Sequence, residues 1–276
     1  MKIGVVGNGF VGHAMTLLRP GVEVLVWDIN PDKCEPHGMG FNEFVDQSEI
    51  IFVAVPTPME HDGTCHLNIV QDVVTKIKTK SCDTPIVLRS TVPPGTSDQM
   101  NVHFMPEFLT ERFWETDFKA CAQWIIGTHD MELVGKIEHM FQLAHAQGSV
   151  DNKQVIHMKP TEAEMVKYTK NCFLAVKVSY FNEMYKLCDK LNVDYESVRS
   201  VACDDPRLGH GQSLVPGHDG HPGYGGTCLP KDTNAMVRIM QQHDVECHVI
   251  NGAVIRNEFV DRPEKDWKQD KGRASI

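Results

Sequence analysis

The residues best suited to covalent chemistry lie in one short stretch, Gly223–Asp232, which reads GYGGTCLPKD. Glycines before Cys228 let the backbone turn tightly and let a ligand approach closely. Pro230 suits the first turn of a helix, and the dipole of such a helix would favour the thiolate form of Cys228. Asp232 would lie one turn later on the same face, beside Lys231. This combination of thiol, carboxylate and amine predicts covalent catalysis.

Cys228 is one of nine cysteines, and a cysteine at an arbitrary position is usually a small buried apolar residue. We expect that role for most of the nine. Only Cys228 has a Gly-Gly pair shortly before it and Pro-Lys-Asp soon after it, which indicates a nucleophile. The chain has no Cys-x-x-Cys pair and its 14 histidines are scattered, so no metal site is predicted.

A glycine-rich fingerprint near the N-terminus indicates what the cysteine works with. The sequence GNGFVG at Gly7–Gly12 lies between an apolar run at 2–6 and a helical segment at 13–18. The next predicted strand, 22–27, ends on Asp28. A glycine triplet alone could be an ordinary turn. Between a strand and a helix, with an acid closing the next strand, it is typical of dinucleotide binding.

Each position of this fingerprint has a physical reason. Gly7 would make the turn, Gly9 would let a pyrophosphate approach, and Gly12 would let the helix pack closely on the strand. The pyrophosphate would lie at the helix N-terminus. Asp28 would accept hydrogen bonds from the adenosine ribose and repel a 2′-phosphate. The sequence therefore predicts NAD as the cofactor, in preference to NADP.

Strands and helices alternate through the first half of the chain. Predicted strands continue at 49–55, 85–88, 101–105, 123–127 and 154–158, with helices at 67–78 and 130–146. This alternation predicts an α/β fold with a Rossmann-like, doubly wound parallel sheet. Ligands bind at the carboxyl ends of such strands. We therefore predict an NAD-binding domain at 1–158.

The second half of the chain is expected to be all-α. Thr161 and Glu164 have the spacing of a capping box that would open a long helix at 161–192. Apolar residues occupy more than one face of this helix, which predicts burial between the sheet domain and something else, often a second subunit. We therefore predict a homodimer through this helix. We assign 159–260 to a central helical domain carrying the cysteine, and 261–276 to a flexible tail.

Lys167 and Asn171 lie four residues apart on the predicted long helix, so their side chains would share one face. Such a pair is usually part of a solvated face. Apolar and aromatic residues surround this pair, which would fit the lining of a site. A solvated face and a site-lining pair both stay open.

The composition limits the possible functions. A chain of 276 residues, 41% hydrophobic and 23% charged, fits one large or two modest globular domains. Its net charge of −10 argues against a nucleic-acid surface, and no apolar run approaches the ~20 residues of a membrane span. The first residues enter a strand directly, so no secretory signal is expected. With an odd number of cysteines, this predicts a cytoplasmic protein.

Together the motifs resemble the nucleotide-sugar dehydrogenases, meaning UDP-glucose 6-dehydrogenase and its GDP-mannose relatives. The matching segments run in the family's order: Gly7–Gly12, Val55–Pro58, Ser90–Thr96, Pro106–Glu111, Ala163–Glu183, Asp205–Gly209 and Gly223–Asp232. The resemblance implies oxidation of a sugar C6 alcohol to a carboxylate with two NAD⁺, UDP-glucose to UDP-glucuronate being the expected reaction. It also implies that the family's C-terminal nucleotide-binding domain is missing from this sequence.

The resemblance assigns roles to the chemistry-bearing residues. Lys167 and Asp232 would handle the proton of the alcohol. Cys228 would add to the resulting aldehyde and pass through a thiohemiacetal and a thioester, while Lys167 and Asn171 would stabilise the oxyanion. Water would then release the acid. The implied catalytic residues are Cys228, Lys167, Asn171, Asp232, Thr91 and Glu107.

The resemblance also implies two sets of binding residues. Those for NAD are Gly7, Asn8, Gly9, Phe10, Val11, Gly12, Asp28, Lys33, Pro56, Thr57, Ser90, Thr91 and Glu111. Those for the nucleotide sugar are Glu107, Phe108, Leu109, Lys167, Asn171, Arg207, Tyr224, Gly225 and Lys231. Arg207 would reach the substrate of a neighbouring subunit. Outside these motifs, Glu107 and Glu111 would be ordinary first-turn helix acids and Arg207 a surface charge.

Two other functions stay open. A single-step β-hydroxyacid dehydrogenase shares the Rossmann domain and a Lys-x-x-x-Asn helix, although Cys228 and its glycines argue against it. A non-catalytic module that binds NAD or a nucleotide sugar, or one half of a split enzyme, is the second alternative.

Overall fold

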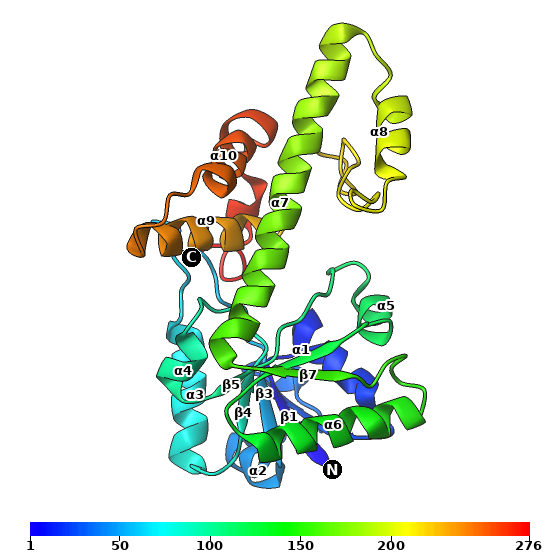
Figure 1. Ribbon diagram of the computed structural model, residues 1–276. Coiled ribbons are helices and arrows are strands. Elements are labelled where there is room, and N and C mark those ends of the chain that lie inside the picture. Colours follow the sequence, from blue (N-terminus) through cyan, green and yellow to red (C-terminus); the bar gives the residue numbers. More distant parts are fainter. The chain divides into compact units, whose positions relative to one another are not determined.

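The computed structural model describes all 276 residues and divides them into two compact units (Figure 1). The first unit comprises Met1–Thr57 and Leu67–Lys167, and the second comprises Pro58–His66 and Tyr168–Ile276. The division at 167/168 falls inside the long helix, nine residues beyond the predicted domain boundary at 158/159.

The first unit is built on a seven-stranded sheet. Its strands are β1 (Lys2–Val6), β2 (Glu23–Trp27), β3 (Ile50–Val53), β4 (Ile86–Leu88), β5 (His103–Phe104), β6 (Trp124–Gly127) and β7 (Val155–Met158). The order is β2-β1-β3-β4-β5-β6-β7, which confirms the Rossmann-like α/β fold. The chain reverses its winding between β1 and β3, and such a switch point is where ligands bind.

One strand pair differs from the predicted all-parallel sheet. β5 and β6 are antiparallel, with Phe104 opposite Gly127, whereas every other neighbouring pair is parallel. A parallel connection needs a crossover that carries the chain back along the sheet. The β5–β6 connection contains only the six-residue helix α5 (Trp114–Lys119), so β6 runs in the opposite direction.

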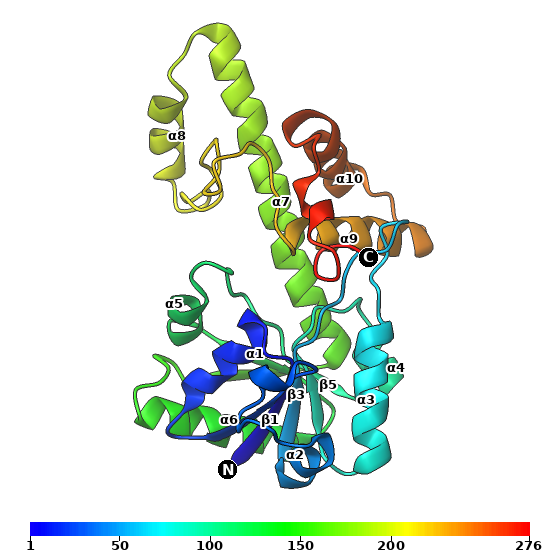
Figure 2. The same ribbon diagram turned by 180° about the vertical axis from the view of Figure 1, so that it is seen from behind.

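Helices cover both faces of the sheet because its strands are apolar on both sides. On β1, Ile3 and Val5 join one core cluster and Val6 joins the other. The first cluster packs under α1 (Phe10–Ala14), its 3₁₀ continuation η1 (Met15–Leu18), α5 and α6 (Met131–Ala146). The second packs under α2 (Phe41–Gln47), α3 (Asn68–Lys80) and α4 (Thr96–Met100), of which α3 and α4 lie side by side in Figure 2.

The long helix α7 spans Pro160–Leu191, one residue earlier at each end than predicted. Its start does not use the expected capping box. The buried carboxylate of Glu164 accepts hydrogen bonds from the backbone N–H groups of Gly95 and Ser97, at 2.5 and 2.8 Å, instead of from Thr161. The local cap is made by Glu162 instead, whose carboxylate accepts a hydrogen bond from the Lys159 N–H at 2.9 Å.

The second unit is helical, as predicted. Besides α7 it contains α8 (Tyr195–Cys203), α9 (Leu229–Gln242), α10 (His248–Arg256), the π-helical turn η3 (Asn257–Asp261) and the 3₁₀ turn η4 (Asp266–Gln269). Figures 1 and 2 show α8 on one side of α7 and α9 with α10 on the other. Tyr168 and Cys172 of α7 pack against Ala235 and Met236 of α9.

The last residues of the chain, predicted as a flexible tail, are folded onto Pro58–His66. Trp267 and Ala274 form a small apolar cluster with Met59. The Met59 N–H donates to the Ala274 carbonyl at 3.0 Å, and the Ile276 N–H donates to the Met59 carbonyl at 3.1 Å. The segment shows no periodicity because its partners lie far earlier in the sequence.

Candidate active site

The glycine-rich loop has the geometry that a dinucleotide requires. Gly7 has a φ of +94°, which favours glycine. A β-carbon at Gly12 would lie 1.8 Å from the Gly7 carbonyl oxygen, so no side chain fits there. Gly9 precedes the first turn of α1, and nothing lies within 4 Å of a β-carbon built on it. This open space at a helix N-terminus fits a pyrophosphate.

Asn8 braces this loop against the end of β2. Its N–H donates to Asp28 Oδ2 at 2.7 Å, and its side-chain amide donates to the Lys33 carbonyl at 2.8 Å. The Asn30 N–H donates to Asp28 Oδ1 at 2.9 Å. Each carboxylate oxygen can accept further hydrogen bonds, so Asp28 retains the capacity to bind ribose hydroxyls.

Predicted residues after β3 and β4 are brought together by hydrogen bonds. Thr57 donates from Oγ1 to the Thr91 carbonyl at 2.9 Å, and Ser90 donates from Oγ to the Val55 carbonyl at 2.7 Å. Adjacent parallel strands end here, which explains why these loops meet. Two other residues predicted to bind NAD, Pro56 and Glu111, are exposed, as is Lys33.

A buried ion pair links Glu107, just after β5, to Lys167 on α7. Lys167 Nζ donates to Glu107 Oε1 at 2.8 Å and to the Glu107 carbonyl at 2.7 Å, and each side chain is 4% exposed. The Leu109 N–H occupies the second carboxylate oxygen at 2.7 Å. Lys167 also lies 5.5 Å from the centre of the Phe108 ring. The predicted residues Glu107, Phe108, Leu109 and Lys167 thus form one cluster.

Arg89 is a charged residue near this cluster that sequence reasoning missed. It follows β4 directly and is buried, and its Nε and Nη1 atoms have no hydrogen-bond partner. Burial lowers the pKa of Arg89, while the carboxylate of Glu107 and the thiol of Cys121 oppose that shift. An arginine directly after an apolar strand was the only signal, and it does not distinguish a buried charge from an exposed one.

The second unit holds Cys228 at the start of α9. Cys228 is the N-cap residue and Pro230 lies in the first turn, as the sequence predicts. The N–H of Asp232 donates to the Cys228 carbonyl at 2.9 Å, and the hydroxyl of Thr227 lies 3.6 Å from Cys228 Sγ. The thiol therefore sits at the positive end of a fourteen-residue helix.

Asp232 lies one turn into α9, fully buried, and receives two side-chain donors. Asn171 Nδ2 donates to Oδ2 at 2.6 Å, and Lys231 Nζ donates to Oδ1 at 2.5 Å. Burial acts to lower the pKa of Lys231, but the Asp232 carboxylate, with Cys65 and Cys228, raises it overall. Lys231 was predicted to bind substrate, and the structure places its ammonium on this carboxylate.

Other cysteines and predicted substrate residues have different surroundings. Cys172 is buried in α7, and burial raises the pKa of its thiol to about 12, which makes it inert. Tyr224 is buried just before Gly225 in the loop that leads to Cys228. The Arg207 side chain is 86% exposed and pairs with Asp205 at 2.5 Å.

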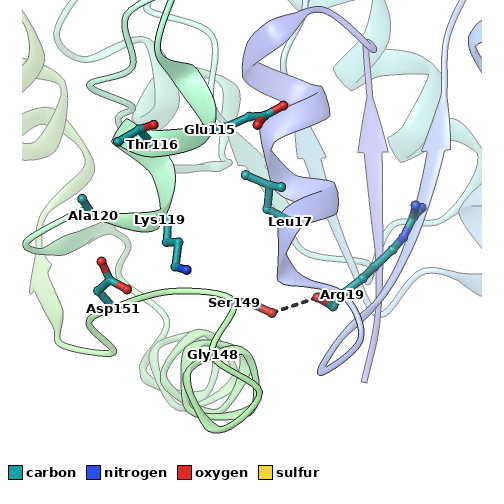
Figure 3. A pocket seen from close by; sticks show the side chains of 9 residues that line it. All are labelled: Leu17, Arg19, Glu115, Thr116, Lys119, Ala120, Gly148, Ser149 and Asp151. Carbon is teal, nitrogen blue, oxygen red and sulfur yellow. Dashed lines mark hydrogen bonds between the residues drawn. The ribbon is translucent and has the colours of Figure 1, made fainter.

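A separate surface pocket of about 460 Å³ lies in the first unit (Figure 3). It is lined by Leu17, Arg19, Glu115, Thr116, Lys119, Ala120, Gly148, Ser149 and Asp151. The Ser149 hydroxyl donates to the Arg19 carbonyl at 2.8 Å, whereas the Arg19 guanidinium points away from the pocket and pairs with Glu35. None of the predicted site residues lines it, so it is distinct from the candidate active site.

No group of three or more His, Cys, Asp or Glu side chains gathers in a metal-binding arrangement. Among the helices, none combines the length and the apolar character that crossing a membrane requires.

The fold and the glycine-rich loop define an NAD-binding unit of the Rossmann type, followed by a helical unit with a cysteine at a helix start. Comparison with protein families agrees. The NAD-binding domain of the UDP-glucose/GDP-mannose dehydrogenase family matches residues 37–145, and its central domain matches residues 161–258. The chain belongs to this family, and its cofactor is NAD.

Individual relatives show the same affiliation. UDP-glucose 6-dehydrogenase of Bacillus subtilis is 34% identical over 89% of this chain and 64% of its own length. The Pseudomonas aeruginosa UDP-glucose 6-dehydrogenase is 30% identical over 88% and 56%. A solved UDP-glucose dehydrogenase from Pyrobaculum islandicum has a TM-score of 0.79 at 28% identity, covering 92% of this chain and 67% of that one. The chain thus spans about half to two thirds of the length of these curated relatives.

Proposed function

We propose that this chain oxidises the C6 alcohol of a nucleotide sugar to a carboxylate, with UDP-glucose as the substrate and UDP-glucuronate as the product. The observation that carries the proposal is Cys228 at the N-cap of α9, one turn before the buried Asp232. A dehydrogenase that stops at an aldehyde or ketone needs no thiol. A nucleophilic thiol is required when an aldehyde must be oxidised further through a covalent adduct.

The two clusters have complementary chemistry. One supplies an ammonium, Lys167, held by Glu107, and the other supplies a thiol and a carboxylate. Lys167 and Asn171 lie one turn apart on α7, so the same helix carries one member of each cluster. We propose that both clusters act on one substrate.

In the first oxidation the alcohol loses its proton and C6 gives up a hydride. Gly7–Gly12 and Asp28 would hold NAD, which would supply the hydride acceptor for each of the two oxidations. We propose that the Asp232 carboxylate, through a water molecule, takes the hydroxyl proton, while the Lys167 ammonium stabilises the developing oxyanion. Two donors to Asp232 fix the orientation of its carboxylate.

In the second oxidation the Cys228 thiolate forms a bond to the aldehyde carbon, and the carbonyl oxygen becomes an oxyanion that Lys167 and Asn171 stabilise. Loss of a second hydride from this thiohemiacetal leaves a thioester. Water, positioned near Thr91 and Glu107, then attacks the thioester carbon and the thiolate leaves. The sum is one alcohol, two NAD⁺ and one water giving one carboxylate, two NADH and three protons.

The stoichiometry of NADH formation tests this proposal. We expect two NADH for each UDP-glucuronate when the chain is incubated with UDP-glucose and NAD⁺. One NADH with a small hydroxy acid would instead identify a β-hydroxyacid dehydrogenase. Thermal stabilisation by NAD or a nucleotide sugar without NADH formation would identify a non-catalytic binding module. The rise in melting temperature that each of a panel of nucleotide sugars causes in the presence of NAD would identify the preferred sugar and nucleotide.

We also propose that the protein is a homodimer through α7. Large apolar side chains are exposed in a stripe along its second-unit part: Phe173 (64%), Tyr180 (51%), Leu187 (50%) and Leu191 (64%). Their spacing of seven, seven and four residues keeps them on one side of the helix. Contiguous exposed apolar surface of this kind is typical of an interface. We expect Phe173→Glu to convert the dimer to a monomer in sedimentation equilibrium, whereas Lys190→Glu, at an exposed position away from this stripe, should not.

The nine cysteines support a reducing compartment as the site of action. All nine are free in the structure. Cytoplasmic redox conditions keep thiols reduced, and the proposed mechanism requires a reduced Cys228. We therefore propose that the chain acts in the cytoplasm.

A further inference from the structure

Three consecutive residues that lead to Cys228 are held by side chains from distant parts of the second unit. The Gly223 N–H donates to Asn182 Oδ1 on α7 at 3.1 Å. The Tyr224 N–H donates to Asn257 Oδ1 at 2.8 Å, and Asn257 Nδ2 donates back to the Tyr224 carbonyl at 2.8 Å. Gly225 lies directly against the guanidinium of Arg262.

Asn257 occupies the central position of this arrangement. It is 1% exposed and follows α10 directly, at the start of the turn η3. One primary amide satisfies both backbone polar groups of Tyr224, much as a neighbouring strand would. Because Tyr224 and Asn257 are both buried, each unmade bond would leave a desolvated polar group. The loop therefore has one strongly preferred position.

The fit leaves no room for side chains on the flanking glycines. A β-carbon on Gly223 would lie 2.3 Å from Asn257 Oδ1, and Gly223 has a φ of +70°. A β-carbon on Gly225 would lie 2.2 Å from Arg262 Nη1. Arg262 is itself fixed, since it is buried and pairs with Asp219 and Asp266. Asn257 and Arg262 thus leave room only for glycine at positions 223 and 225.

Gly226 is different, because a β-carbon on it would meet nothing within 4 Å. The residues held in this way end at Gly225, and only Gly226 and Thr227 separate Gly225 from Cys228, the N-cap residue of α9. Holding Gly223–Gly225 therefore fixes where Cys228 enters the helix and keeps its sulfur at the helix N-terminus.

We propose that Asn257 is a positioning residue for the Cys228 thiol, assisted by Asn182 and Arg262. This inference deepens the proposed function, because it concerns the same nucleophile, and it extends the site to residues that no sequence motif indicated. It does not require that Asn257 touch the substrate.

The reactivity of Cys228 towards iodoacetamide, resolved by peptide mass spectrometry, tests the proposal without substrate or NAD. We expect Asn257→Ala to slow alkylation of Cys228 at neutral pH by about two- to fivefold, the size of a helix N-terminal effect on a thiolate. The rates of Cys82 and Cys203 should stay unchanged. Asn251→Ala, in the middle of α10 and with partial exposure, is the matched control and should change none of these rates.

A double-variant comparison separates positioning from general stability. Asn182→Ala should lower the Cys228 rate less than Asn257→Ala, since it removes one loop bond rather than two. The double variant should match Asn257→Ala, because the loop is already released. An unchanged or raised Cys228 rate in folded Asn257→Ala would overturn the proposal. So would a parallel change at Cys203, which would show that Asn257 supports the whole unit.

Failure of the proposed function gives a different pattern. If the chain forms no NADH but Cys228 alkylation responds as expected, the positioning role stands and the catalytic assignment falls. Where NADH does form, Asn257→Ala should reduce kcat for UDP-glucuronate formation and leave the KM for NAD unchanged. A change in that KM alone would contradict a role at the thiol.

Discussion

Two glycine-rich loops in this molecule each lead into a helix, and they are held in different ways. Gly7–Gly12 opens α1 in the first unit, and Gly223–Gly226 precedes Cys228 and α9 in the second unit. Both place an open helix N-terminus where negative charge is expected, on a pyrophosphate in one case and on a thiolate in the other.

The first loop is held mainly by its sequence neighbours and by adjacent strands. Its would-be β-carbons meet the loop itself and the backbone at Ala54, and Asn8 ties it to Asp28 and Lys33 at the end of the next strand. The first three strands of the sheet and the segments that directly follow them supply all of these contacts, so the contacts are part of the Rossmann-like fold.

The second loop depends on residues from α7, from η3 and from beyond η3. Asn182, Asn257 and Arg262 lie on both sides of the loop in the sequence, roughly thirty to forty residues away. We therefore expect the cofactor loop to tolerate substitutions at distant residues and the nucleophile loop to be sensitive to them.

The largest effect is expected for a substitution at Cys228, which should impair catalysis without affecting the NAD-binding loop. Cys228→Ser should lower the rate of UDP-glucuronate release by about 10³-fold or more, because a serine hydroxyl without an activating base is a poor nucleophile. NAD binding, measured by fluorescence quenching, should be unchanged. The exposed Cys82→Ser is the control. Normal release of the acid by Cys228→Ser would exclude the thioester.

The next largest effects are expected at two glycines of the cofactor loop, Gly12 and Gly9. Gly12→Ala forces a methyl group against the Gly7 carbonyl, so we expect loss of about 1–3 kcal/mol of stability together with weaker NAD binding. Gly9→Ala has room for the methyl group and should leave the melting temperature unchanged. It should still weaken NAD binding by at least about tenfold, because the pyrophosphate approaches there. Equal melting temperatures for both variants would contradict the geometry described for Gly12.

The same comparison explains what could be predicted from the sequence. The Rossmann-like fold, the fingerprint at Gly7–Gly12 and the helix start at Cys228 depend on local patterns, and the structure contains them. The antiparallel β6, the external partner of Glu164 and the folded residues after Asp261 depend on contacts between distant segments. Asn257 and Arg89 were missed for that reason, since a lone Asn or Arg carries no periodicity.

A smaller effect, on stability, is expected at Gly225 in the nucleophile loop. Gly225 is not in a left-handed conformation, so Gly225→Ala is opposed by steric contact with Arg262 and, less closely, with Asp266, and not by backbone strain. We expect it to destabilise the protein by about 1–3 kcal/mol in urea unfolding. Gly252→Ala, within α10 and with nothing within 4 Å, should instead stabilise it by about 1 kcal/mol. Two changes of the same sign would show that the clash at Gly225 is relieved elsewhere.

The smallest effect concerns His103 on β5, an inner strand of the first unit's sheet that is far in sequence from the nucleophile loop. Burial lowers the pKa of His103 below its ordinary value of 6.5, and the nearby cations His129 and Lys78 lower it further. The Asp130 carboxylate raises the pKa but does not cancel this shift. Its Nδ1 pairs with the Thr128 hydroxyl at 2.7 Å. Just below pH 6.5 the unfolded chain therefore binds more protons at this histidine than the folded chain does. The contribution of His103 to stability is complete above its unfolded-state pKa and is lost as the pH falls towards the folded-state pKa.

His103→Gln should remove this dependence, so its free energy of unfolding should fall less than that of the parent chain between neutral and mildly acidic pH. A parallel fall in both would assign the acid sensitivity to other groups, while Cys228 alkylation should be the same in both chains.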